Sequence, residues 1–136
     1  MDRLIPPSRR VYKIDRAEPA TDDSEGQHIM KYTLLYAYDP ATAGPSDGEV
    51  PEWIEFDNQV KAAGIFVHEA GLHPAADGKT LTIRDGESSI DKIAAGDTVA
   101  GFYVIDVPDE ETAVSWAQRI PTARYGHVEI RQVVEF

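Results

Sequence analysis

Alternation of large and small side chains marks the first regular element of the chain. Between Lys31 and Tyr38, the large side chains of Tyr32, Leu34 and Tyr36 fall on every second residue. A period of two places such residues on one side of a β-strand and their neighbours on the other. The segment therefore predicts a strand.

A helical period follows the loop at residues 39–48, whose Pro, Gly, Asp and Ser content is typical of irregular structure. Trp53, Phe56 and Val60 recur at i, i+3 and i+7, which places them on one face of a helix. Gly64 suits the position just beyond the last helical turn. The spacing predicts a helix between the loop and this glycine.

Short strands are predicted in the middle of the chain. Residues 65–70 and 80–84 are rich in residues that favour strands, and turn-forming residues lie between them at 71–79. The segment 84–98 mixes Gly, Asp and Ser with isolated apolar residues. That mixture predicts a hairpin turn followed by a loop.

The segment 101–134 predicts a strand, a helix and a second strand in close succession. Residues 102–107 are mostly aromatic or β-branched, which suits a strand, and Pro108 ends the run. Asp109 can cap the following helix at its N-terminus. One apolar stripe predicts that helix, and it consists of Ala113, Trp116, Ala117 and Ile120. Alternation predicts the last strand, with one face made of Val128, Ile130, Gln132 and Val134.

The predicted order of elements is β-α-β-β-β-α-β, with a short central strand. In essentials this is the split βαβ, or ferredoxin-like, pattern of the α+β class. An antiparallel sheet then carries its helices on one face. The other face has to be buried against another surface, because it carries apolar residues. These are Tyr32, Leu34 and Phe102, or the residues that alternate with them. We therefore expect a symmetric dimer, because large exposed apolar faces usually mark interfaces.

The first 29 residues differ from the rest of the chain. They contain Pro6, Pro7 and Pro19, a basic start and an acidic, polar end, without a sustained apolar period. We expect an extended or disordered arm at residues 1–29, attached to one domain at 30–136. The alternative is an arm that wraps a partner subunit.

Composition narrows the classes of function. The 136 residues are 42% apolar, which supports one packed domain. A net charge of −11 repels phosphate backbones and anionic lipid surfaces, so neither a nucleic acid nor a membrane is expected as a partner. The chain has no cysteine, and no apolar run approaches the roughly 20 residues that span a bilayer. A cytoplasmic protein is expected.

Three segments together resemble the YCII-related, or DGPF-domain, proteins. They are MKYTLLYAYDP at 30–40, AAGIFVHEAGLHPA at 62–75 and GFYVIDVPDEETAVSWAQRIPTARYGHVEIRQV at 101–133. The resemblance implies a dimeric α+β barrel, built from two ferredoxin-like protomers with a pocket in each. The Asp-Gly-Pro-Phe run that names the family is absent. In the loop at 89–97, Asp91 lines up with the motif's aspartate, and the Gly-Pro-Phe is missing.

His73 is the best placed of the four histidines, because it follows a predicted strand and begins a turn. The resemblance implies a histidine and an aspartate at the active site, with Asp91 as the partner of His73. An imidazole oriented by a carboxylate is a suitable general base near neutral pH, since its unperturbed pKa is about 6.5. Two interpretations stay open: His73 acts on a substrate, or it hydrogen-bonds to the backbone of its turn. Asp91 is likewise either the partner or an exposed turn or cap residue.

Three further residues are candidates for substrate binding. Asp106 interrupts an apolar strand, so it either lines a pocket or stands at the wet end of the strand. Glu69 and His68 lie on opposite faces of a strand, so only one of them can face a pocket. Arg124 could meet an anionic substrate or anchor its loop.

No metal site and no cofactor are expected. His68, Glu69 and His73 fit no familiar ligand spacing, and the chain has no phosphate-binding glycine loop. One function in view is a cofactor-free lyase or isomerase in which His73 moves a proton. Another is a non-catalytic dimer that binds an unidentified small molecule, which the missing Gly-Pro-Phe favours slightly. A third is a partner-binding role for the arm.

Overall fold

Four antiparallel strands form the main sheet of the computed structural model, which describes residues 29–136. The strands are β1 (Met30–Tyr38), β2 (Phe66–Gly71), β5 (Thr98–Val107) and β6 (His127–Gln132). Their order across the sheet is β2-β5-β1-β6. This order, with helices between β1 and β2 and between β5 and β6, confirms the predicted ferredoxin-like α+β fold.

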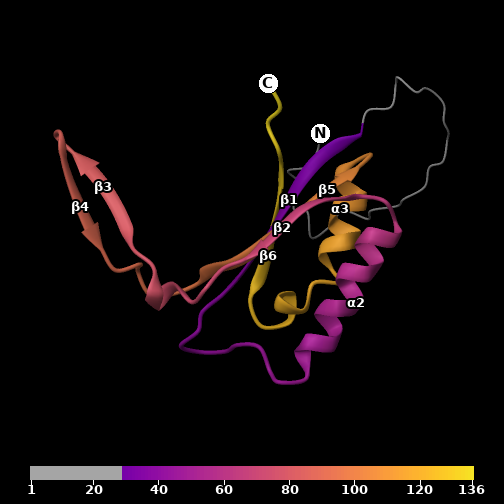
Figure 1. Ribbon diagram of the computed structural model, residues 1–136, viewed down its shortest axis with the longest axis horizontal. Coiled ribbons are helices and arrows are strands. Elements are labelled where there is room, and N and C mark those ends of the chain that lie inside the picture. The colour runs from indigo at the N-terminus through magenta and orange to yellow at the C-terminus, as the bar shows by residue number, and fades with distance from the viewer. Residues whose placement is uncertain (1–28) are drawn as a thin grey trace.

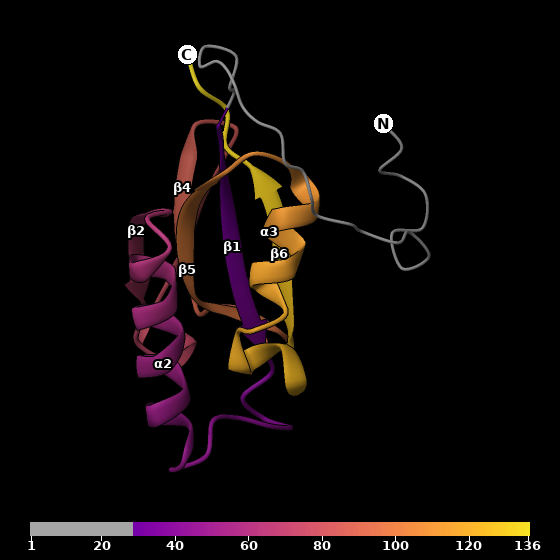
Figure 2. The same ribbon diagram turned by 90° about the vertical axis from the view of Figure 1, so that its right-hand side faces the viewer.

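Two helices cover one face of the sheet. Helix α2 (Glu49–Ala62) and helix α3 (Glu110–Ala117) lie on the same side in Figure 1, and in Figure 2 both stand in front of the strands. The central strands send every second side chain toward the helices, as the alternating burial of β1 and β5 shows. The core between the layers includes Tyr32, Leu34, Tyr36, Phe56, Val60, Tyr103, Ile105, Val107, Ala113, Ala117 and Ile120.

Within residues 29–136, no helix covers the opposite face of the sheet. Leu35 pairs with Phe102, and Thr33 pairs with Val104, so these four side chains share that face. All four are partly exposed in the protomer. The strand residues that were predicted to lie on an uncovered face of the sheet therefore lie on two different faces. The ring of Tyr32 and the side chain of Leu34 pack under the helices, whereas Phe102 remains on the open side.

A two-stranded hairpin projects from the main sheet. Its strands are β3 (Thr80–Arg84) and β4 (Glu87–Asp91), and they extend away from the helices in Figure 1. The turn between them uses positive φ at both central positions, Asp85 (52°) and Gly86 (81°). Such values match a tight hairpin turn whose twist suits the flanking strands. The predicted turn after residue 84 is present, but the next segment is a strand where a loop was expected.

Local signals placed most element ends correctly. Asp109 caps α3 by accepting a hydrogen bond from the Thr112 N–H at 2.9 Å. Gly64 has φ of 75° just beyond α2, as expected of a helix-ending glycine. Strand β5 begins at Thr98, earlier than predicted, because it also pairs with the end of β1. Strand β6 ends at Gln132, so the alternation predicted to Val134 runs past the sheet.

The predicted arm at residues 1–29 lies outside the described residues, except for Ile29, which is exposed. Two short 3-10 turns complete the description, η3 (Ala75–Asp77) and η4 (Pro121–Arg124). Within residues 29–136, no helix is long and apolar enough to cross a membrane.

Candidate functional site

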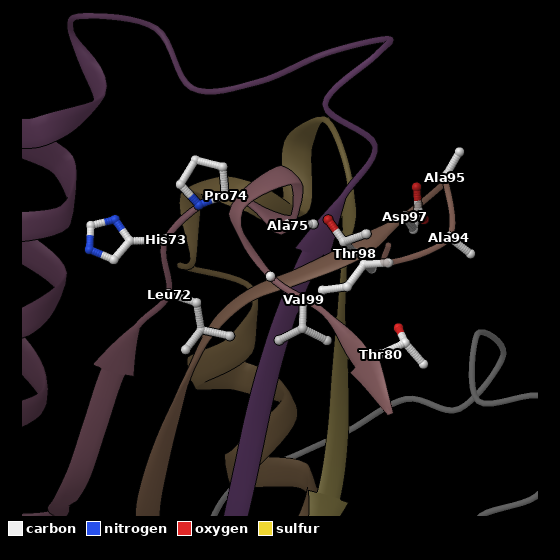
Figure 3. Close-up of a pocket in the computed structure, with 12 residues that line it drawn as sticks. Leu72, His73, Pro74, Ala75, Thr80, Ala94, Ala95, Asp97, Thr98 and Val99 are labelled. Carbon is white, nitrogen blue, oxygen red and sulfur yellow. The ribbon is translucent and has the colours of Figure 1, made fainter. Parts of the chain in front are cut away.

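A cavity of about 610 Å³ lies where the hairpin joins the main sheet. Its walls come from the segment after β2, the base of the hairpin and the start of β5 (Figure 3). The lining is mostly apolar, with a few polar groups contributed by His73, Thr80, Asp97 and Thr98. Ligand pockets in proteins commonly have this size and this mixture of surfaces.

Backbone contacts shape the cavity wall. The Leu72 N–H donates to the Ala100 carbonyl at 2.8 Å, which holds the segment after β2 against β5. Pro74 then caps the start of the short turn η3, and Gly78 caps its end. A Cβ on Gly78 would lie 2.7 Å from Ile93 Cδ1, so a glycine there lets Ile93 close the wall.

His73 lines this cavity, but none of the residues that the structure describes gives it an acidic partner. The side chain is exposed, and in Figure 3 its ring points away from Asp97 and Thr98. Within residues 29–136 it forms neither an ion pair nor a side-chain hydrogen bond, to carboxylate or to backbone. Its predicted role as a general base stays a prediction.

Asp91 ends strand β4 and does not line the cavity. Its Cα partner across the hairpin is Thr80, which does line it, so the two side chains share one face of the hairpin. Asp91 is exposed. The protomer thus places the predicted aspartate beside the mouth of the cavity, without a contact to His73.

A different histidine meets a carboxylate there. His127 Nδ1 lies 3.0 Å from Asp97 Oδ2, and Asp97 lines the cavity. The pair forms because β5 and β6 flank the end of β1, where Ala37 pairs with both Val99 and His127. Neither His127, whose side chain is about half exposed, nor Asp97 was among the predicted site residues. This pair could have been predicted only from the order of the strands in the sheet, which places β5 and β6 on either side of β1.

The chain matches the YCII-related domain over residues 30–136. It belongs to the YCII-related family. This match confirms the predicted resemblance, and it includes every element that builds the cavity. A search of curated proteins found no match.

Two acidic candidates of this YCII-related protein lie away from the cavity. Asp106 is near the far end of β5, on the open face, with Oδ1 3.9 Å from Lys31 Nζ. Glu69 pairs with Tyr103, so its side chain is on the helix-covered side of the sheet, whereas His68 is on the open side. Their predicted opposite orientation is therefore correct. Their proposed role in substrate binding stays a prediction.

Arg124 is engaged by a carboxylate of its own chain. Its Nη2 donates to Glu52 Oε1, and this bond is the main cause that raises the pKa of the arginine. Both side chains are exposed. The contact ties η4 to helix α2, which matches the loop-anchoring alternative. Among the residues that the structure describes, no cluster of acidic or histidine side chains could hold a metal ion.

Proposed function

We propose that this YCII-related protein is a homodimer that binds a small organic molecule in the cavity at the base of the hairpin. The observation that carries the proposal is the cavity itself, with its largely apolar walls and few polar groups around His73 and Asp97. Apolar walls supply binding energy, and a few placed polar groups supply orientation. A cytoplasmic location remains a prediction from composition.

The open face of the sheet supports the dimer. Leu35, Phe102 and Val104 lie there, no helix of the described residues covers them, and the hairpin projects on that side (Figure 1). A second subunit on the open face would come within reach of the hairpin. An isolated two-stranded hairpin is marginal in water, so cover by a partner would also stabilise it.

Analytical ultracentrifugation of the full chain tests the dimer. A Val104→Glu substitution places a charge on the open face and is expected to give monomer, because burying an unpaired charge is costly. Ile54→Glu is the matched control, since Ile54 is exposed on the outer side of helix α2. A wild-type protein that stays monomeric at micromolar concentration contradicts the dimer.

A cavity-filling pair tests the binding site. Ala75 lines the cavity, whereas its neighbour Ala76 is exposed and does not line it. Ligands found by NMR screening of the wild type should lose affinity for Ala75→Trp and keep it for Ala76→Trp. Equal losses in both variants would place the binding elsewhere.

A second candidate function is acid–base catalysis of the cofactor-free lyase or isomerase type. The 3.0 Å approach of His127 to Asp97 favours it, because a carboxylate can orient an imidazole for proton transfer. His73, on another wall, would then contact the substrate or take the proton itself. Conversion of a bound ligand by the wild type, and its loss in both His127→Gln and His73→Gln, is the expected result for catalysis.

A further inference from the structure

A second cavity lies on the other side of the sheet, between the end of β1, the loop at 39–48 and the start of helix α2. It measures about 290 Å³ and is separate from the cavity at the hairpin base. Four aromatic side chains and one carboxylate line it, namely Tyr36, Tyr38, Trp53, Tyr125 and Glu49.

The aromatic rings stand in two pairs. Tyr36 and Trp53 have ring centroids 4.8 Å apart at an interplanar angle of 46°. Tyr38 and Tyr125 have centroids 5.4 Å apart at 76°. Strand β1 supplies one ring of each pair, helix α2 supplies Trp53, and the segment after η4 supplies Tyr125. Rings from three elements thus line one small space.

Glu49 joins the two pairs. Its Oε2 accepts a hydrogen bond from Trp53 Nε1 at 2.8 Å and another from Tyr125 Oη at 2.9 Å. Burial, and then the bond to Glu49, raises the pKa of Tyr125 to about 12, so the phenol stays protonated at neutral pH. The carboxylate is therefore held in place by two neutral donors, each on an aromatic ring that lines the cavity.

Among residues 29–136, Glu49 forms no ion pair. The residue is only 5% exposed, and both of its hydrogen bonds fall on one oxygen. Arg124 is near enough for its charge to interact with Glu49, but its ion pair is with Glu52. A buried carboxylate without a cation is costly, because neutral donors replace only part of its hydration. A positively charged ligand would offset this cost.

We propose that the cavity around Glu49 binds a small organic ammonium ion. Aromatic faces attract ammonium groups through their quadrupoles, and methylated ammonium ions also gain from the apolar contact. The carboxylate adds the opposite charge, and the net charge of −11 favours the approach of cations from solution. The volume suits a ligand with few heavy atoms. This site is independent of the proposed function at the hairpin base.

Choline and its uncharged carbon isostere, 3,3-dimethylbutan-1-ol, form the direct test. The chain has two tryptophans, and Trp116 lies away from this cavity, under the guanidinium of Arg119. A full-length Trp116→Phe variant therefore makes Trp53 the only tryptophan, and its emission reports on the cavity. Choline should change that emission saturably. The affinity of the isostere should be lower than that of choline by a factor of about ten or more.

Glu49→Gln tests the role of the charge. The amide keeps an acceptor for Trp53 and Tyr125 but removes the negative charge, so the preference for choline over the isostere should disappear. Glu55→Gln is the matched control, because Glu55 is exposed on the same helix and does not line this cavity, and the preference should survive there. Circular dichroism checks that both variants are folded.

Two results would overturn the proposal without any variant. One is equal binding of choline and its isostere, which would indicate a merely apolar cavity. The other is an unchanged Trp53 emission with both compounds. Failure of ligand binding at the hairpin base would leave this test unaffected, because the two cavities share no lining residue.

Discussion

Asp97 Oδ2, just before β5, lies 3.0 Å from His127 Nδ1, at the start of β6, and the two strands flank the end of β1. The contact joins the start of the last strand–helix–strand unit to its final strand. Both side chains are about half exposed. An exposed pair of this kind adds little stability, so its value to the protein is expected to be functional.

Replacing Asp97 by Asn is the first prediction. The free energy of unfolding should change by only about 0–1 kcal/mol, the range of exposed ion pairs. Affinity for ligands of the hairpin-base cavity should fall, because Asp97 is the one acidic residue among the described residues that line it. Chemical denaturation and NMR titration measure the two effects. Asp91→Asn is the control, since Asp91 does not line the cavity, and an equal effect of both variants would argue against a local role for Asp97.

The second prediction concerns Gly101, which faces Gly71 across β2 and β5. A Cβ at Gly101 would lie 2.6 Å from the backbone oxygen of Ala70 and would also meet the Tyr36 hydroxyl. Gly101→Ala should therefore lower the free energy of unfolding by about 1–3 kcal/mol, as overpacking does.

Gly71→Ala is the matched control for that variant. A Cβ there meets nothing within 4 Å, and its φ is not in the left-handed region. Urea denaturation should show near wild-type stability for Gly71→Ala. If Gly101→Ala is equally stable, the sheet relaxes more easily at this point than the close approach implies.

The third prediction concerns Asp57 and acid stability. Asp57 accepts a hydrogen bond from Tyr103 Oη at 2.8 Å and pairs with Lys61 Nζ at 2.9 Å. The bond to Lys61, and then that to Tyr103, holds the pKa of Asp57 below its usual value. A carboxyl group whose pKa is lower in the folded state stabilises the protein above its unfolded pKa, about 3.9. That contribution is lost as pH falls through the lower, folded value.

Asp57→Asn should therefore be destabilising at pH 7 and nearly neutral once the wild-type carboxyl group is protonated. Thermal unfolding of both proteins at neutral and at strongly acidic pH measures the difference. Asp47→Asn, in the exposed loop before α2, is the control, and it should leave the pH dependence of stability in acid unchanged. A constant gap between wild type and Asp57→Asn at all pH values would contradict the assignment.

The fourth prediction concerns the apolar face of the hairpin. Leu81 and Ile90 are paired across the strands, and together with Ile83 they are 59–64% exposed. If a second subunit covers this face, Leu81→Ser with Ile90→Ser should raise the dimer dissociation constant at least tenfold. Sedimentation equilibrium gives that constant.

Thr82 and Ser89 supply the control on the other face of the same hairpin, where their hydroxyls lie 2.9 Å apart. Replacing both by Ala should leave dimerisation unchanged. A dimer insensitive to both double variants would show that the hairpin lies outside the interface.

Local pattern in the sequence determined the elements of this protein. The period of two at Tyr32, Leu34 and Tyr36 predicted β1, because a pleated strand has to send these side chains to one side. The helical spacing of Phe56 and Val60 predicted the buried stripe of α2. Asp109 marked the start of α3 because its side chain satisfies a backbone N–H that the helix cannot.

Tertiary structure alone decided which of these elements meet. The residues 80–84 were predicted as a strand, but nothing local showed that they would pair only with 87–91 and project from the sheet. His127 and Asp97 meet because β1 lies between β6 and β5, an order that the chain direction does not specify. The same holds for Tyr125 and Glu49, which far-apart segments bring to one cavity. Periodicity reflects the geometry of one element, whereas sites depend on strand order and on packing between elements.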